Sequence, residues 1–187
     1  MTAPSRRSSR AARARKPGRL ILVLGGADSG KSQFAIRLCG TRSPRAFLAT
    51  CQPADPEMRE RVRRHQEARH GQWDTVEIPL ALARWFEASG ARYRSILLDC
   101  LTLWLANLQA DGHDSVSIID RAQELLDAMR AVPARVVVVS NEVGWGIVPR
   151  NAMARQFRSL AGKINQQFAH AADEVYVTIS GLPLKLK

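Results

Sequence analysis

Residues 25–32 have the types and the spacing of a phosphate-binding loop. Their sequence, GGADSGKS, fits the pattern G-x-x-x-x-G-K-[ST]. In such a loop the glycines let backbone N–H groups wrap a phosphate, and the N-terminus of the following helix adds partial positive charge. We expect Lys31 to reach the β- and γ-phosphates of a nucleotide and Ser32 to bind Mg²⁺. The other nucleotide-binding positions predicted in this loop are Gly25, Gly26, Ala27, Asp28, Ser29 and Gly30.

A loop of this kind is expected to have a partner acid at the end of a neighbouring strand, which holds Mg²⁺ directly or through water. Asp99 ends the apolar run SILLD and is predicted to be this second metal ligand. An alternative is that Asp99 caps the helix that begins at Leu101, and the two roles can coexist. For the loop itself the alternative is a chance match in a glycine turn, which the strand before it and the helical pattern after it disfavour.

A histidine that could act as a nucleophile lies in the stretch RVRRHQEARH. At 100° per residue, Met58, Val62, His65 and Arg69 share one face of a predicted helix. A neutral imidazole can attack an α-phosphorus and form a phosphoramidate, and an arginine can bind phosphates in a bidentate manner. On spacing alone, a packed or capping histidine is the simpler interpretation of His65. The four histidines of the chain do not have the spacing of metal ligands.

Apolar, β-rich runs alternate with helical patterns, which predicts a single-domain α/β fold with a mostly parallel sheet flanked by helices. Strands are expected near residues 19–24, 45–49, 75–78, 95–99, 135–140 and 174–179, and helices near 31–40, 56–69, 80–89, 101–109, 115–130 and 150–171. The final residues, SGLPLKLK, predict a turn followed by a short edge strand, whose lysines discourage pairing with another sheet. Residues 19–187 are therefore predicted to form one P-loop domain.

Positive charge is concentrated at the N-terminus. The net charge is +11, but residues 1–19 contain seven Arg and Lys and no acid, so the other 168 residues have a net charge of +4. Residues 1–18 are rich in Ser, Ala, Pro and Arg, a composition that predicts a disordered extension. A solvated extension is the simplest interpretation, and contact with nucleic acid or another polyanion is the alternative. Because aromatic residues do not alternate with basic ones, nucleic-acid binding is not expected.

The chain is predicted to be a cytoplasmic protein without a membrane span. Its longest apolar runs are far shorter than the ~20 residues that a span needs. Arg6 and Arg7 resemble the start of a twin-arginine export signal, but the apolar stretch that follows them is the first core strand, so export is not expected. The three cysteines are odd in number and form no C-x-x-C pair, which predicts reduced thiols.

Six stretches, taken in order, resemble one enzyme family. They are LVLGGADSGKS, FLATCQPADPEMRERVRRHQEAR, WDTVEIP, LLDCLTLWLANL, VVVVSNEVGWGIVP and RQFRSLAGKINQQFAHAADEVYVTISGLPLKLK. The family is the bifunctional adenosylcobinamide kinase/adenosylcobinamide-phosphate guanylyltransferase of cobalamin biosynthesis, and the resemblance covers about residues 20–187. It implies a RecA-like P-loop architecture and a homotrimer.

The resemblance also implies two reactions. ATP or GTP first phosphorylates the aminopropanol hydroxyl of adenosylcobinamide. GTP then guanylylates an enzyme histidine with release of pyrophosphate, and the GMP passes to the cobinamide phosphate to give adenosylcobinamide-GDP. The family's acceptor histidine falls on His65, which favours a catalytic role over simple packing.

Further nucleotide-site residues follow from the resemblance, position by position. Two groups line the nucleotide, one after the second strand and one after the acceptor histidine: Thr50, Cys51 and Gln52, then Gln66, Glu67, Ala68 and Arg69. Glu77 and Asp99 match acidic positions of the nucleotide site. A carboxylate at Glu77 can accept two hydrogen bonds from guanine, and the alternative is a solvated acid at a strand edge.

The chain departs from the family pattern at three positions. Asp28 stands where members often have Arg, which removes a phosphate contact, and its side chain is expected to point away from the phosphates. Cys51 stands near a position where members commonly have Ser or Ala. Arg64 replaces the first of two adjacent histidines found in some members, so the acceptor is unambiguous.

Residues after the fifth strand are candidates for binding cobinamide. Asn141 and Glu142 are expected at the carboxyl edge of the sheet, where ligands of open α/β sheets bind. We hypothesise that Glu142 activates the cobinamide hydroxyl or holds Mg²⁺, with a purely structural turn as the alternative. Trp104 and Trp145 are candidates for a corrinoid surface, or equally for the core.

Three other functions compete with the bifunctional enzyme. A P-loop kinase of another small molecule explains the loop and Asp99 but gives His65 no role. A nucleic-acid-associated P-loop ATPase would explain the basic extension and predicts salt-sensitive binding that is lost without residues 1–18. A regulatory nucleotide-binding module without catalysis is the third, and turnover with cobinamide would exclude it.

Overall fold

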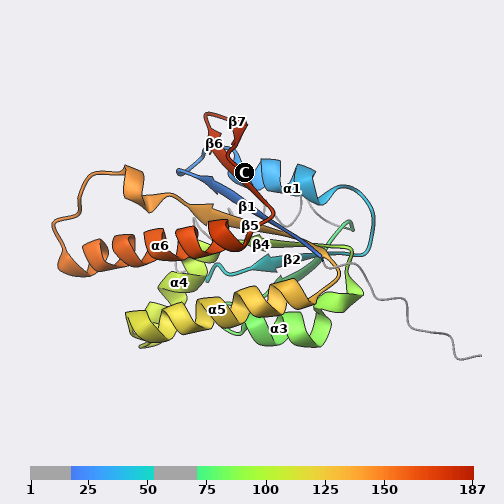
Figure 1. Ribbon diagram of the computed structural model, residues 1–187, viewed down its shortest axis with the longest axis horizontal. Helices are drawn as coiled ribbons and strands as arrows, with labels where there is room; N and C mark the ends of the chain where they lie inside the picture. Colours follow the sequence, from blue (N-terminus) through green and yellow to red (C-terminus); the bar gives the residue numbers. More distant parts are fainter. Residues whose placement is uncertain (1–17, 53–70) are drawn as a thin grey trace, which may run out of the picture.

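The computed structural model describes residues 18–52 and 71–187 (Figure 1). Its seven strands form one sheet in the order β3-β2-β4-β5-β1-β6-β7, in which every pair is parallel except β6 with β7. The strands are β1 Arg19–Gly25, β2 Arg45–Ala49, β3 Asp74–Glu77, β4 Ser95–Asp99, β5 Arg135–Asn141, β6 Glu174–Ile179 and β7 Leu182–Lys185. The predicted mostly parallel α/β sheet is confirmed.

In the described part of the chain, five helices cover the two faces of this sheet, with α1 on one face and the other four on the opposite face (Figure 1). They are α1 Lys31–Cys39, α3 Leu82–Ser89, α4 Leu101–Ala110, α5 Ser115–Ala131 and α6 Ala152–Ala171. Two short 3₁₀ helices, η1 Gly90–Arg92 and η2 Val143–Trp145, follow α3 and β5. Each α-helix starts and ends within two residues of its predicted range. The helix predicted over residues 56–69 lies outside the described residues, as does most of the N-terminal extension.

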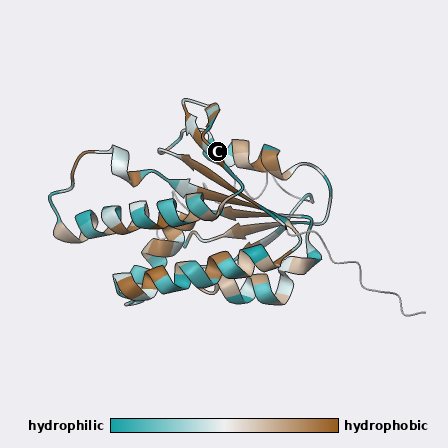
Figure 2. Ribbon diagram, viewed as in Figure 1, coloured by the Kyte–Doolittle hydropathy of each residue, from teal (hydrophilic) through white to brown (hydrophobic). Residues whose placement is uncertain are grey.

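The side chains of β1 alternate between two apolar clusters. Leu20, Leu22 and Leu24 point into the larger cluster, which α3, α4, α5 and α6 complete. Ile21 and Val23 point into the smaller cluster on the α1 face. Both sets are buried, so β1 has no polar face, and the same holds for β2, β4 and β5 (Figure 2). A strand buried on both sides must be a continuous apolar run, which is why these strands are legible in the sequence.

The predicted C-terminal edge strand is confirmed as β7, which pairs antiparallel with β6. Its Lys185 forms an ion pair with Glu174 on β6, and Arg19 at the start of β1 pairs with the same carboxylate. The Tyr176 hydroxyl donates a third interaction to Glu174 at 2.7 Å. One carboxylate therefore ties the first strand of the domain to the last two.

Charge pairing at Glu174 makes the stability of the fold depend on pH. The Tyr176 hydrogen bond, with help from Lys185 and Arg19, outweighs burial and lowers the pKa of Glu174 from its ordinary 4.5. A carboxyl with a lowered folded-state pKa stabilises the protein above its unfolded-state pKa, and this contribution is lost as pH falls through the folded-state value.

We expect Glu174→Gln to lower the melting temperature near neutral pH by about 2–4 °C, the shift that about 1 kcal/mol causes in a domain of this size. The difference from the wild type should shrink as pH falls below about 4.5, because the wild-type carboxylate is then protonated too. Thermal melts between about pH 3 and about pH 7 measure this. The control is Glu124→Gln, since Glu124 is exposed on α5. An unchanged difference across the pH range would contradict the expectation.

Candidate active site

The predicted phosphate-binding loop joins the end of β1 to the start of α1. Gly25 is the last residue of β1 and Lys31 the first of α1, so both flanking elements are where the motif requires them. Gly30 occupies the N-cap of α1 with φ 87°, a left-handed conformation that glycine adopts without strain. The first N–H groups of a helix have no partner within it, so the start of α1 is suited to bind an anion.

Lys31 turns back over the loop that precedes it. Its ammonium donates to the Gly26 carbonyl at 2.8 Å. This contact places the lysine side chain across the loop. A bound phosphate oxygen could there replace the Gly26 carbonyl as the hydrogen-bond acceptor of the ammonium group. Asp28 is exposed and has φ 50°, in the left-handed region that Asp tolerates better than most residues.

Strand β6 and the turn that follows it contact the phosphate-binding loop, which the sequence analysis did not predict. The Ser29 hydroxyl lies 2.9 Å from the Thr178 hydroxyl, and the Gly181 N–H donates to the Ser29 carbonyl at 2.9 Å. A Cβ on Gly25 would lie 2.4 Å from Ser29 Oγ and 2.5 Å from Thr178 Oγ1, so only glycine fits there. The Ser-Gly pair before LPLK was the sequence signal for this turn.

Thr50 lies at the end of β2, but its side chain is used inside the protein. The residue is fully buried, and its hydroxyl donates to the Cys100 carbonyl and accepts from the Cys100 N–H. Its own carbonyl accepts from the Asn107 amide at 2.8 Å. Thr50 therefore holds the ends of β2 and β4 together. The next two positions are open to solvent, Cys51 in part and Gln52 fully.

Asp99 ends β4 at the same edge of the sheet as the phosphate-binding loop. Burial raises the pKa of the Cys100 thiol to about 12; the negative charge of Asp99 adds to this effect and the positive charge of Lys31 opposes it. Both charged groups thus lie within electrostatic reach of one thiol. The N-cap of α4 is Cys100 rather than Asp99, so the capping role considered for Asp99 is wrong.

The remaining predicted residues fall into three groups. Glu77 ends β3, is exposed, and pairs in register with Ala49, so it lies at the same edge of the sheet one strand beyond β2. The predicted catalytic residue and the group after it lie outside the described residues: His65, Gln66, Glu67, Ala68 and Arg69. Ser32 is half-buried in the first turn of α1.

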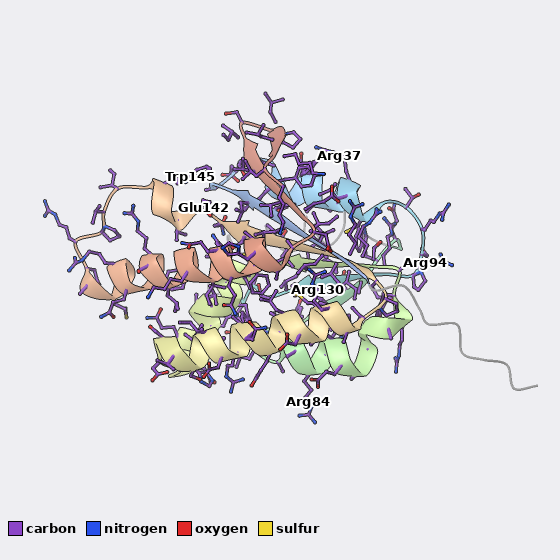
Figure 3. The ribbon with its side chains drawn as sticks, in the orientation of Figure 1. Arg37, Arg84, Arg94, Arg130, Glu142 and Trp145 are labelled. Atoms are coloured by element: carbon purple, nitrogen blue, oxygen red, sulfur yellow. The ribbon has the colours of Figure 1, made fainter. Side chains whose placement is uncertain are left out.

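The two tryptophans considered for a corrinoid surface differ. Trp104 is only 2% exposed, packs in the core and donates its indole N–H to the Leu80 carbonyl, so its surface role is excluded. Trp145 in η2 is 62% exposed. Figure 3 shows Trp145 and Glu142 at the same end of the sheet, whereas Arg94 lies at the opposite end. Of the two, only Trp145 stays a candidate.

The oxygen donors at this edge suit a hard cation. The Ser32 hydroxyl and the Asp99 carboxylate are ligand types that Mg²⁺ prefers, with waters and phosphate oxygens completing its shell. Within residues 18–52 and 71–187, no group of three or more His, Cys, Asp or Glu is placed to hold a metal without such help. None of the helices in that part of the chain is long and apolar enough to cross a membrane.

Comparison with known proteins identifies close relatives. A family described as cobinamide kinase / cobinamide phosphate guanyltransferase matches residues 21–186. Over 180 residues the chain is 41% identical to the bifunctional adenosylcobalamin biosynthesis protein CobU of Salmonella typhimurium, with 90% of this chain and 99% of the relative covered. The protein of the same name from Escherichia coli gives the same identity and coverage. CobP of Pseudomonas aeruginosa is 40% identical over 167 residues, covering 89% and 96%.

Similarity to solved structures shows the fold alone. The KaiC-like protein PH0186 of Pyrococcus horikoshii superposes with a TM-score of 0.52 at 12% identity, covering 86% of this chain and 71% of that one. The RadB recombinase gives a TM-score of 0.50 at 17% identity, covering 86% and 74%. Both likenesses agree with the RecA-like P-loop architecture predicted above.

Cysteine labelling tests whether Cys51 lines the nucleotide site. Burial raises the pKa of both Cys39 and Cys100 to about 12, and these thiols are 3% and 4% exposed. We therefore expect a maleimide near pH 8 to label the native protein once, at Cys51, and the denatured protein three times. Mg²⁺-GTP should slow the native reaction, and Cys51→Ser should abolish it. Labelling of Cys51 at the same rate with and without nucleotide would remove it from the site.

Proposed function

The chain belongs to the cobinamide kinase/cobinamide phosphate guanyltransferase family, and from this membership we propose how its residues divide the two reactions. The enzyme phosphorylates adenosylcobinamide with ATP or GTP and then transfers GMP from GTP to give adenosylcobinamide-GDP in cobalamin biosynthesis. The observation that supports this most strongly is the family match over residues 21–186, which includes both the loop and the stretch containing His65. A plain small-molecule kinase or a nucleic-acid-associated ATPase receives no comparable support.

Residues 25–32 bind the phosphates in both half-reactions. The start of α1 offers backbone N–H groups, and Lys31 exchanges its Gly26 carbonyl for a phosphate oxygen. Because Ser29 is fixed by Thr178 and Gly181, the loop keeps its shape when the lysine leaves the carbonyl. The exposed Glu77 at the end of β3 is suited to accept hydrogen bonds from guanine, and Cys51 and Gln52 line the space between.

His65 is the nucleophile of the guanylyltransferase half-reaction. One imidazole nitrogen forms a bond to the α-phosphorus of GTP, and the bond from that phosphorus to the α–β bridging oxygen breaks, so pyrophosphate leaves with the electron pair. The phosphate oxygen of cobinamide phosphate then attacks the same phosphorus and releases the histidine. Arg69 and the neighbouring Gln66, Glu67 and Ala68 complete the nucleotide site.

Ser32 and Asp99 would hold Mg²⁺ beside the phosphates. Bound there, Mg²⁺ would supply positive charge against the charge that develops on the phosphate oxygens. Two observations support this metal site. Ser32 and Asp99 have the oxygen donors that Mg²⁺ prefers, and Lys31, next to Ser32, lies close enough to Asp99 for both charges to act on Cys100.

We further propose that the enzyme is a cytoplasmic homotrimer. Large exposed apolar side chains occur in two stretches, one from the end of η2 to the start of α6 and one from the end of β6 to the residue after β7: Trp145, Ile147, Val148 and Met153, then Ile179, Leu182, Leu184 and Leu186. Exposed apolar groups of this kind are typical of surfaces that a partner covers. Free thiols at Cys39, Cys51 and Cys100 suit a reducing compartment.

The guanylyltransferase half is tested with GTP labelled at the α-phosphate and Mg²⁺, without cobinamide. We expect covalent label that is lost in acid and kept in base, as for a phosphoramidate, and none when the label is on the γ-phosphate. His65→Ala should abolish the labelling, and His70→Ala, in the same stretch, should leave it unchanged. Label that persists in His65→Ala would assign the acceptor to another residue. A wild-type enzyme that binds GTP but takes no label would lack the second activity.

A further inference from the structure

Four polar residues form a continuous hydrogen-bond chain that ends on Glu142. The Asn141 N–H donates to Thr102 Oγ1 at 2.7 Å, and Thr102 Oγ1 lies 3.1 Å from Ser140 Oγ. Ser140 Oγ donates to Asn165 Oδ1 at 2.7 Å, and Asn165 Nδ2 donates to Glu142 Oε1 at 2.9 Å. This hydrogen-bond chain runs from α4 through β5 to α6, so three elements fix the position of one carboxylate.

The direction of every link in this chain is determined by its two ends. The Asn141 N–H can only donate, and the Asn165 oxygen can only accept. The single proton of the Ser140 hydroxyl is therefore used on Asn165, so the Thr102 hydroxyl must donate to Ser140. All donors then point toward Glu142, whose Oε1 receives the last of them as an acceptor.

The residues of this hydrogen-bond chain are buried, and buried polar groups destabilise the fold unless each one has a hydrogen-bond partner. Ser140 is 1% exposed, Asn165 4% and Thr102 6%. Asn165 directly follows the buried Ile164 on the apolar face of α6. An aliphatic residue at this position would need no hydrogen-bond partner. A second bond from Asn165 Nδ2, to the Asn141 carbonyl at 3.2 Å, uses the amide fully.

Backbone contacts fix the same carboxylate beside the phosphate-binding loop. The Glu142 N–H donates to the carbonyl of Gly25, the first residue of the loop, at 3.1 Å. Arg158 on α6 donates to the Gly144 carbonyl and so holds η2, which follows Glu142. In the described part of the chain no hydrogen bond or ion pair involves Glu142 Oε2, and the residue is half-buried rather than enclosed. One carboxylate oxygen is therefore anchored by Asn165, and the residue that carries it follows β5 at the edge of the sheet where the loop begins.

We propose that Glu142 is the base of the kinase half-reaction, and that Asn165, Ser140 and Thr102 position it. The proposal rests on the function proposed above. The aminopropanol hydroxyl oxygen of cobinamide forms a bond to the γ-phosphorus, and the bond from that phosphorus to the β–γ bridging oxygen breaks. The nucleoside diphosphate leaves with the electron pair, and the hydroxyl proton passes to Glu142 Oε2.

Glu142→Gln tests the base directly, because the amide oxygen of glutamine can still accept from Asn165. We expect the kinase kcat to fall by about 10²- to 10⁴-fold, with nucleotide KM unchanged and with α-labelling of the enzyme by GTP alone retained. Formate should restore part of the turnover of Glu142→Ala, since a free carboxylate can occupy the vacated space. Equal loss of α-labelling, or recovery of Glu142→Gln by excess Mg²⁺, would overturn the assignment and indicate a structural or metal-binding role.

Two variants of one residue test the positioning chain. Thr102→Val keeps the shape and removes the hydroxyl, whereas Thr102→Ser keeps the hydroxyl and removes a methyl group. A positioning role predicts that Val lowers the kinase kcat by about 3- to 10-fold, the value of one hydrogen bond, while Ser stays close to the wild type. A packing role predicts the reverse order, which would overturn the proposal.

Asn165→Leu removes the link that touches the carboxylate. We expect the kinase kcat to fall by about 10- to 100-fold, the value of a hydrogen bond to a charged group, again with α-labelling retained. The matched control on the same helix is Asn151→Ala: Asn151 caps α6 by accepting from the Met153 and Ala154 N–H groups, so its loss should lower the melting temperature and leave kcat unchanged. Equal kinase losses in both variants would attribute the effect to helix stability. In every case a wild-type enzyme without kinase turnover contradicts the proposed function itself.

Discussion

The placement of β1 between β5 and β6 is the constraint on which the site depends. Because all three strands are parallel and in register, Gly25 lies opposite Asn141 on one side and Thr178 on the other. The carboxyl ends of β1, β5 and β6 therefore meet, and the residues that follow them can touch. The loop begins at this meeting point, Glu142 follows β5 there, and the β6–β7 turn closes the other side.

The phosphate-binding loop owes its shape to residues far away in the sequence. A loop that presents backbone N–H groups to a ligand leaves few of its own polar groups to hold it in place. Thr178 and Gly181 supply that support through Ser29. The antiparallel β7 therefore does more than cover an edge of the sheet, because the turn that leads into it contacts the phosphate-binding loop through Gly181.

The elements were predictable because each core strand is buried on both faces and hence apolar throughout. The loop was predictable because its chemistry fixes both residue types and spacing. Long-range polar contacts were not: Thr102 and Ser140 are 38 residues apart, and nothing local marks them as partners. Thr50 matched a nucleotide-site position, and nothing in the sequence indicated that its hydroxyl bonds to the backbone of Cys100. Trp104 could not be distinguished from a surface residue until the packing of α4 against Leu80 was known.

The strand order also bears on how one loop serves two chemistries. Phosphoryl transfer requires attack on the γ-phosphorus and guanylyl transfer attack on the α-phosphorus, so the two nucleophiles need different lines of approach to one bound nucleotide. Glu142 follows β5, whereas the segment with His65 follows β2, and β4 with its terminal Asp99 lies between these two strands. The proposed base of the first reaction and the proposed nucleophile of the second therefore follow strands on opposite sides of β4, which ends in the proposed metal ligand Asp99. A division of this kind lets each half-reaction be lost separately, since removing a group on one side leaves the other side and the shared loop intact.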